Sequence, residues 1–414
     1  MEFNCNVKIV DMIMGSGKSS AAINYINQSD GEKFLYITPF KDEINDRIIP
    51  QCAKKNFVQP EKFGTKLNGL KYLVERGQNI VSTHALFHRF DREIIDMCRS
   101  QNYTLILDEV TDVIEEYQIS PNDFNLLKEN YIYIDENTGF IRWREDQENY
   151  NGKFSEEKRL CEMNCLAFYG GSVMMWLFPI EAFNAFRSIY ILTYMFNAQI
   201  QRYYYDYYGL PYKYIYVIGD RQEDYQFTEN FVSQRIRYDY SQLIHILDHE
   251  KMNQIGDSTY DLSMNWYKRN KNNVVMKKLK SNLNNFFRNI TKTPSNLNLW
   301  TTFKEYKPLL SGKGYGRGYL QHTARATNKY KDRVSIAYVV NKFLNGTIKN
   351  FFMQNNIEVD EDGYALSEML QFIWRSAARE GKEIQVYIPS IRMRTLLVKW
   401  IDENKKNFDN AKNS

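Results

Sequence analysis

The sequence contains few cysteines, no long apolar run and no strong excess of charge. Its five cysteines, at positions 5, 52, 98, 161 and 165, form no regular disulfide framework, which suits a reducing compartment. The longest apolar stretch, Val173 to Ile180, is too short to cross a bilayer, and the N-terminus has no secretion signal. The net charge is only +4. These absences predict a cytoplasmic protein with no membrane partner.

Acidic residues are also absent from one long segment of the second half. Between Asp261 and Glu305 no Asp or Glu occurs, and apolar residues recur at helical spacing. The basic residues there are Lys268, Arg269, Lys271, Lys277, Lys278, Lys280, Arg288, Lys292 and Lys304. We interpret residues 262–304 as a basic helical insertion, whose charged face is either simply solvated or contacts nucleic-acid phosphates.

The stretch from Met12 to Ser19, Met-Ile-Met-Gly-Ser-Gly-Lys-Ser, predicts a phosphate-binding loop of the Walker A type. It follows an apolar strand at 7–10 and continues into a helix, which is the context that this P-loop motif requires. The glycines let backbone N–H groups turn toward phosphate oxygens, and the helix adds the positive end of its dipole. Lys18 would reach the β- and γ-phosphates, and the Ser19 hydroxyl would bind Mg²⁺. The residues expected to bind the nucleotide are Gly15, Ser16, Gly17, Lys18, Ser19 and Ser20.

A mostly apolar strand from Tyr103 ends in two adjacent carboxylates, Asp108 and Glu109. A Mg²⁺-bound nucleoside triphosphate needs such a pair. Asp108 would hold the water shell of the metal, and Glu109 would orient and deprotonate the attacking water.

Further strands are predicted at 33–38, 79–84 and 188–194, and helical segments separate the earlier ones. This alternation predicts a parallel sheet covered on both faces, with the ligand at the carboxyl ends of its strands. Between about 118 and 186 the pattern loosens, which predicts an insertion with a hairpin around 131–143.

Together, these motifs resemble those of a superfamily 2 helicase of the DEAD/DEAH-like kind. The phosphate loop resembles motif I, Thr38-Pro39 motif Ia, Ser82-Thr83-His84 motif Ic, Asp108-Glu109 motif II, and Leu192-Thr193-Tyr194 motif III. The match departs from the DEAD-box branch because Val110-Thr111 follow Glu109. The resemblance implies that Thr38, Pro39, Thr83, His84 and Thr193 contact a nucleic-acid strand.

Two segments of the second half extend the resemblance. Residues 323–328 resemble motif V, which implies nucleic-acid contacts by Arg325 and Thr327. A helix predicted over 367–380 would place Gln371, Arg375 and Arg379 on one face at successive four-residue steps. This helix resembles motif VI, whose arginines reach the γ-phosphate, where a guanidinium neutralises charge in the transition state.

The sequence therefore predicts an α/β fold of two tandem RecA-like parallel-sheet domains, with the nucleotide in the cleft between them. Their predicted bounds are 1–200 and 213–414, joined by a hinge at 201–212. The predicted function is a nucleic-acid-dependent ATPase that uses Mg²⁺ and acts as a helicase or translocase. DNA is the favoured partner, with a single strand held in a groove across both domains. The compact chain suggests a phage or another mobile element, acting in a host cytoplasm beside replication or recombination proteins.

Two alternatives stay open from the sequence. A terminase-type DNA-packaging ATPase would share the phosphate loop and the acidic pair, but its second half should carry a nuclease with spaced carboxylates rather than aligned arginines. An NTP-gated clamp on nucleic acid or on a protein would close without processive motion. A strand-displacement assay would distinguish the clamp from a helicase.

Overall fold

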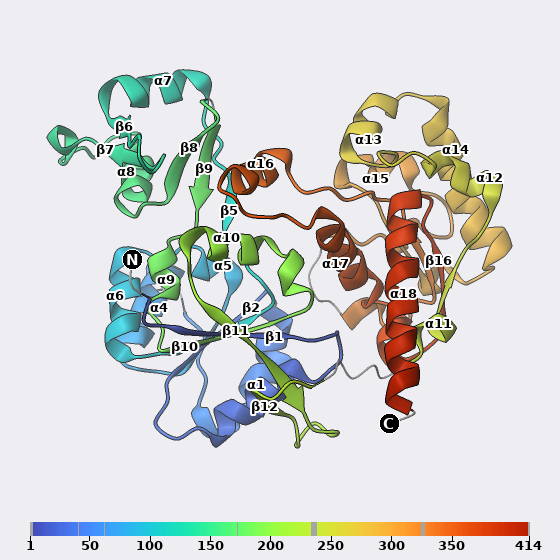
Figure 1. The fold of residues 1–414 in the computed structure, drawn as a ribbon, viewed down its shortest axis with the longest axis horizontal. Coiled ribbons are helices and arrows are strands. Elements are labelled where there is room, and N and C mark those ends of the chain that lie inside the picture. The colour runs from blue at the N-terminus through green and yellow to red at the C-terminus, as the bar shows by residue number, and fades with distance from the viewer. Residues whose placement is uncertain are drawn as a thin grey trace. The chain divides into compact units, whose positions relative to one another are not determined.

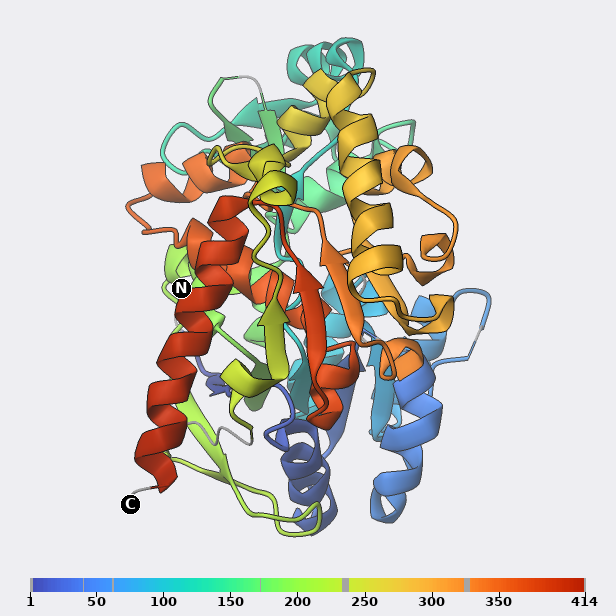
Figure 2. The same ribbon diagram turned by 90° about the vertical axis from the view of Figure 1, so that its right-hand side faces the viewer.

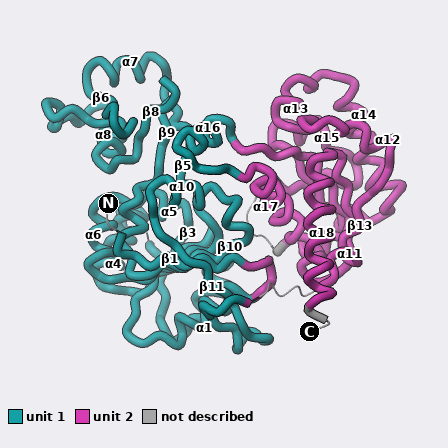
Figure 3. Tube along the Cα trace, viewed as in Figure 1, with its two compact units in different colours: residues 1–11, 17–231, 345–359 teal, residues 12–16, 232–344, 360–414 magenta. Residues whose placement is uncertain are grey.

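The chain forms two compact units in the computed structural model, which describes residues 3–39, 41–61, 63–171, 173–232, 238–323 and 328–412. Unit 1 comprises 1–11, 17–231 and 345–359, and unit 2 comprises 12–16, 232–344 and 360–414 (Figure 3). Apart from the five residues 12–16, the chain stays in unit 1 up to Phe231, and it returns there for the segment 345–359 before it ends in unit 2.

Unit 1 is built on a seven-stranded sheet with the order β12-β11-β1-β10-β4-β2-β3 (Figure 1). The strands are β1 (Asn6–Asp11), β2 (Phe34–Thr38), β3 (Ile80–Thr83), β4 (Thr104–Asp108), β10 (Ser188–Thr193), β11 (Tyr212–Ile218) and β12 (Gln226–Thr228). All neighbours pair in parallel except β12, which is antiparallel to β11. The predicted α/β class with parallel sheets is confirmed.

The central strands of this sheet are apolar and almost wholly buried, as expected for strands covered on both faces. Ile9, Leu105 and Ile191 have no exposed surface and belong to one large core. The helices of unit 1 outside residues 114–177 are α1 (Lys18–Gln28), α2 (Lys41–Glu43), α3 (Ile49–Gln51), α4 (Lys66–Glu75), α5 (His84–Phe87), α6 (Arg92–Gln101), α9 (Ile180–Phe183), α10 (Ile200–Tyr208) and α16 (Gly346–Gln354). A π-helical turn, Ile44–Ile48, joins α2 to α3.

Residues 114–177 form a small module with a core of its own. A three-stranded antiparallel sheet contains β5 (Ile114–Glu116), β8 (Leu166–Tyr169) and β9 (Val173–Leu177), and a hairpin pairs β6 (Ile132–Ile134) with β7 (Ile141–Trp143). The helices are α7 (Pro121–Asn130) and α8 (Ser155–Glu162). Leu127, Phe154 and Leu166 are buried together in its core. The predicted hairpin is confirmed, and the predicted insertion at 118–186 corresponds to this module with slightly different bounds.

Unit 2 contains a four-stranded parallel sheet with the order β13-β16-β15-β14. Its strands are β13 (Ile244–Ile246), β14 (Asn298–Thr301), β15 (Ser335–Tyr338) and β16 (Ile384–Tyr387). Its helices are α11 (Tyr240–Leu243), α12 (Glu250–Asn253), α13 (Met264–Asn270), α14 (Val274–Asn285), α15 (Lys307–Leu310), α17 (Glu361–Ile373) and α18 (Ile391–Lys412). In Figure 2 the long helix α18, in red, and α14, in gold, run alongside these strands. Helices α13 and α14 occupy the predicted basic insertion, as its helical spacing indicated.

The structure differs from the predicted domain boundary at 201–212. Those residues form most of helix α10, whose Tyr203, Tyr204 and Tyr205 have no exposed surface. Strand β11, predicted to open the second domain, instead pairs with β1 in the sheet of unit 1. The apolar rings of the tyrosines pack into the core of unit 1, so this segment cannot serve as an exposed hinge.

The predicted helix over 367–380 also ends earlier than expected. Helix α17 stops at Ile373, with Trp374 as its C-cap, and a separate 3₁₀ turn covers Ala377–Glu380. The Ser376 hydroxyl donates to the Ile373 carbonyl and accepts from the Ala378 N–H, so it ends one element and begins the next. Gln371, Arg375 and Arg379 therefore do not lie on one face of a continuous helix.

No helix in the described part of the chain combines the length and apolar character needed to cross a bilayer.

Replacing Gly256 tests the close packing of unit 2. A Cβ atom at this position would overlap the backbone of Pro389, whereas one at Gly346 would meet no atom within 4 Å. We expect Gly256→Ala to lower the free energy of unfolding by about 1 to 3 kcal/mol, because a backbone has to move to relieve the overlap. Urea unfolding of both variants measures this, and Gly346→Ala serves as the tolerated control. Equal stability of the two variants would contradict the packing described here.

Candidate nucleotide-binding site

The carboxyl ends of three neighbouring strands of unit 1 meet at one edge of its sheet. In the parallel register Asp11 of β1 lies beside Thr193 of β10, and Leu192 lies beside Asp108 of β4. The glycine-rich loop follows β1, and Glu109 follows β4, so both predicted nucleotide motifs start from this edge. Ligands of parallel α/β sheets usually bind there.

The glycine-rich loop has the backbone that its sequence predicts. Gly15 and Gly17 have φ values of 84° and 90°, a region that side-chain-bearing residues rarely adopt. The Ser16 N–H donates to the Ile13 carbonyl over 3.2 Å, and the Ala21 N–H donates to the Gly17 carbonyl over 2.8 Å as α1 begins. A Cβ atom on Gly17 would also overlap the ring of Tyr225, so glycine is required at that position twice over.

Lys18 is the first residue of α1 and is half-buried. Burial lowers the pKa of its ammonium group, whereas the carboxylates of Glu109, Asp11 and Asp108 oppose that shift. The lysine therefore belongs to the same charged cluster as the acidic pair. An ammonium surrounded in this way is suited to exchange carboxylate partners for phosphate oxygens.

Asp108 is held by residues from the neighbouring strand β2 and from the start of helix α5. The Tyr36 hydroxyl donates to its carboxylate over 3.2 Å, and a ring nitrogen of His84 lies 3.1 Å from its carbonyl oxygen. Burial, with the negative charges of Glu43 and Glu109, raises the pKa of Asp108 to about 8, against the opposing effects of Arg47 and Tyr36. A bound cation would favour the ionised form.

Glu109 has a left-handed backbone, with φ at 69°, which is unusual for a residue that carries a side chain. Its N–H donates to the Leu192 carbonyl over 3.0 Å. The chain therefore changes direction after β4 at a residue that is still hydrogen-bonded to β10. Strained residues of this kind concentrate at functional sites.

Asp11 is a site residue that the sequence interpretation missed. Its carboxylate accepts the backbone N–H groups of Met195 and Phe196, over 2.7 and 2.9 Å, and so fixes the turn that follows β10. Burial raises its pKa, against the effect of those two bonds. The available signal was an acidic residue at the end of the strand before the loop.

Glu43 and Arg47 were also missed. The Arg47 guanidinium donates to the Ser20 hydroxyl over 3.1 Å and lies 3.9 Å from the Glu43 carboxylate. The Thr38 hydroxyl donates to Glu43 over 3.3 Å. Their four-residue spacing directly after a strand was a signal that could have found them.

The residues predicted to contact nucleic acid have different environments. Thr38 and Thr193 have no exposed surface, and His84 is 8% exposed. In this conformation their side chains are therefore not available to contact a nucleic-acid strand. Pro39 and Thr83 are half-buried. Arg325 and Thr327, assigned to motif V, lie outside the described residues.

The predicted arginine cluster belongs to unit 2. Gln371 lies on α17 and is half-buried, as is Arg375 just beyond the end of that helix, whereas Arg379 is exposed on the 3₁₀ turn. Trp374, between them in sequence, is buried against the rings of Tyr240 and Trp400.

The loop has features that fit a phosphate ligand and a hard cation. The buried Ser16 hydroxyl has no hydrogen-bond partner among the described residues, and the space beside Gly15 is open. The Ser19 hydroxyl and the Asp108 carboxylate are oxygen ligands of the kind that Mg²⁺ prefers, with phosphate oxygens completing its shell.

The strand order defines an α/β protein with a glycine-rich loop and an acidic strand end at the carboxyl edge of its parallel strands. The chain belongs to the YonV family. It is 39% identical over 411 residues to the SPbeta prophage-derived uncharacterized protein YonV of Bacillus subtilis (strain 168), covering 96% of this chain and 99% of that protein. Family models match at 114–176, described as the YonV middle domain, and at 238–401, described as the YonV C-terminal Rossmann-like domain.

A solved structure described as S. tokodaii Xpd4 is also similar over 95% of this chain and 94% of that chain. Its sequence identity is 10% and its TM-score is 0.47, and a similarity at this level carries no argument about function.

Replacing Asp108 tests its buried environment without any ligand. An aspartate in an unfolded chain has a pKa near 3.9, so between about pH 4 and pH 8 the unfolded chain ionises this carboxyl while the folded protein keeps its proton. The free energy of unfolding should therefore fall over this range, and Asp108→Asn should remove that loss. We expect the variant to gain more than about 1 kcal/mol relative to wild type between pH 5 and pH 8, measured by urea unfolding in chelator.

The matched control is Asp46→Asn, which removes an exposed carboxyl from the neighbouring π-helical turn. It should change stability equally at both pH values. The burial argument for Asp108 fails if the two variants behave alike.

Proposed function

We propose that this chain is a nucleic-acid-dependent ATPase that acts as a helicase or translocase on DNA. One observation carries the proposal: Lys18 lies in one electrostatic cluster with Asp108 and Glu109, at the edge where the glycine-rich loop leaves the sheet. That arrangement combines a phosphate cradle, an ammonium group, a metal ligand and a base for water, which are the parts that phosphoryl transfer to water needs.

At the carboxyl edge of the seven-stranded sheet, the proposal gives each residue a separate task. The backbone N–H groups from Gly15 to Ser19 hold the phosphates, and Lys18 pairs with the β- and γ-phosphate oxygens. Ser19 and Asp108 would hold Mg²⁺, which when bound neutralises charge on the phosphates. Glu109 accepts the proton of the attacking water, and Asp11 positions the turn after β10 beside it.

The resemblance to superfamily 2 helicases extends the proposal to unit 2. Here the two parallel-sheet units act as tandem RecA-like domains, and nucleotide binding and hydrolysis change their separation. Arg379, which is exposed, is the proposed arginine that neutralises charge at the γ-phosphate, with Gln371 and Arg375 as its neighbours. A single DNA strand would be gripped alternately by the two domains.

The family relationship supports the proposed setting. The Bacillus subtilis relative is prophage-derived, and the sequence itself suggested a phage or mobile element. A DNA motor acting in phage replication or recombination, within the host cytoplasm, fits both observations.

The packaging alternative gains no support from unit 2. In the described residues no group of three or more His, Cys, Asp or Glu side chains is placed to hold a metal, whereas a nuclease of that class would need such a cluster. We therefore retain the motor as the proposed function.

Hydrolysis by single-site variants tests the proposal. Steady-state ATP hydrolysis should require Mg²⁺ and rise strongly with single-stranded DNA. Lys18→Ala and Glu109→Gln should each lower kcat by about 100-fold or more, because each removes a group that acts on the transition state. Arg379→Ala should lower the DNA-stimulated kcat to a similar extent with little change in KM.

The control is Arg92→Ala, which removes an exposed arginine from α6 with the same change in charge and should leave kcat unchanged. Hydrolysis that ignores DNA would contradict the motor, and full activity of Arg379→Ala would contradict its assignment. A strand-displacement assay then separates the motor from a clamp, because a clamp binds DNA without separating strands.

A further inference from the structure

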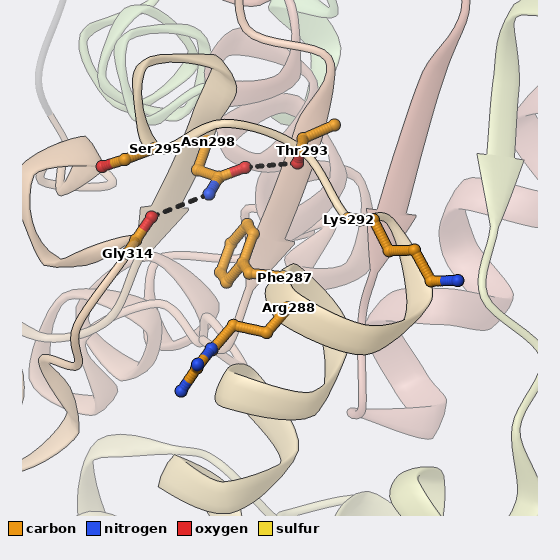
Figure 4. A pocket seen from close by; sticks show the side chains of 7 residues that line it. All are labelled: Phe287, Arg288, Lys292, Thr293, Ser295, Asn298 and Gly314. Atoms are coloured by element: carbon orange, nitrogen blue, oxygen red, sulfur yellow. Dashed lines mark hydrogen bonds between the residues drawn. The ribbon is translucent and has the colours of Figure 1, made fainter.

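Unit 2 contains a pocket of about 380 Å³ at the edge of its sheet where two parallel strands begin (Figure 4). Asn298, which lines it, is the first residue of β14, and its register partner Ser335 is the first residue of β15. The usual ligands of such sheets bind at the opposite edge, where strands end. The candidate nucleotide site lies at the edge where strands end. This pocket lies at the edge where strands begin, so it is a separate site.

A hydrogen-bond network fixes the polar wall of the pocket. The Thr293 hydroxyl lies 2.6 Å from the Asn298 side-chain oxygen and 2.9 Å from the Ser335 hydroxyl, and the Asn298 amide donates to the Gly314 carbonyl over 2.9 Å. Asn298 is buried, and Gly314 has a φ of 92° with open space beside it. These bonds hold the wall in one arrangement, built from β14, the start of β15 and the loop around Gly314.

The rim of the pocket is cationic. Arg288 and Lys292 line it and are exposed, and neither forms an ion pair with a described residue. Among the described residues no carboxylate lines the pocket, and the sequence has no acidic residue between Asp261 and Glu305. Lys292 has a left-handed backbone, with φ at 53°, directly after the helix that ends at Ile290, which is a common way for a chain to turn at the end of a helix.

An aromatic ring forms part of the lining between these polar groups. Phe287 is 1% exposed and stacks on Tyr315 with 5.0 Å between ring centroids. In Figure 4 its ring is seen between Arg288 and the amide of Asn298. The buried ring pair supports the base of the pocket, and the cations beside hydroxyl and amide groups suit a phosphate ester with its charge at the rim.

We propose that this pocket binds a phosphate group, supplied by the backbone of a nucleic-acid strand. Arg288 and Lys292 pair with the phosphate oxygens, and the Thr293–Asn298 wall receives the adjoining sugar. The pocket thus gives unit 2 a nucleic-acid contact at the strand-start edge of its sheet. This inference rests on the proposed function only in taking nucleic acid as the source of the phosphate, and it requires no hydrolysis.

Binding of a fluorescein-labelled oligothymidine, without nucleotide, tests the site. The variant Arg288→Gln/Lys292→Gln removes both rim charges and keeps side-chain length. The matched control is Lys277→Gln/Lys278→Gln, which removes the same charge from exposed positions on α14 in the same acid-free segment. We expect the pocket variant to weaken binding about 10-fold or more and to reduce the slope of log K against log salt by about one to two, with a clearly smaller effect in the control.

Equal losses in the two double variants would overturn the pocket, because they would indicate a diffuse basic surface. Unchanged binding in the pocket variant, with its wild-type melting temperature, would overturn the nucleic-acid source. In a separate arm, inorganic phosphate should raise the melting temperature of the wild type and not of the pocket variant. A phosphate effect without any loss of oligothymidine binding would assign the pocket to a small phosphorylated molecule instead.

Lys18→Ala separates this inference from the proposed function. This variant should bind the oligothymidine as tightly as the wild type while it fails to hydrolyse ATP. Loss of binding in the pocket variant beside intact binding in Lys18→Ala therefore supports the pocket whatever the outcome of the hydrolysis assay.

Discussion

The site in unit 1 depends on the balance of charge around a half-buried lysine. Burying the Lys18 ammonium is costly, and the carboxylates of Asp11, Asp108 and Glu109 offset part of that cost. Burial, together with the negative charges of Glu43 and Glu109, in turn raises the pKa of Asp108. Phosphate groups and a divalent cation would complete such a cluster. The phosphates would pair with the lysine, and the cation would pair with the carboxylates.

The order of the strands makes this cluster possible. Strand β10 lies between β1 and β4, and it carries the backbone atoms to which both acidic ends are tied. Asp11 accepts from the turn after β10, and the Glu109 N–H donates to the Leu192 carbonyl. The turn after β10 thus helps to set the spacing of the site, although Met195 lies 184 residues beyond Asp11 in sequence.

The division of the chain into units follows from where apolar surface is buried. The tyrosines of α10, strand β11 and the segment 345–359 all complete unit 1, so the main part of unit 2 begins later than predicted, at residue 232, and is interrupted by 345–359. Residues 114–177 bury a separate core, in agreement with the family model that covers 114–176. That agreement indicates a distinct module between strands β4 and β10, which pair with each other in parallel.

Local patterns in the sequence determined the loop, the strands, the hairpin and the amphipathic basic helices, because periodicity, glycine and short apolar runs act within a few residues of the chain. The sequence alone did not reveal Asp11, Tyr36, Glu43 or Arg47 as site residues. The predictions from sequence also extended helix α17 past Ile373 and assigned a hinge to residues that form the buried helix α10. Those features depend on residues that are far apart along the chain. A carboxylate belongs to the site only when other strands place the remaining site residues beside it. A tyrosine-rich helix is part of the core only when other elements pack against it. The short motifs in the sequence therefore determined which reactive groups the protein has. Tertiary packing decided which other residues surround those groups.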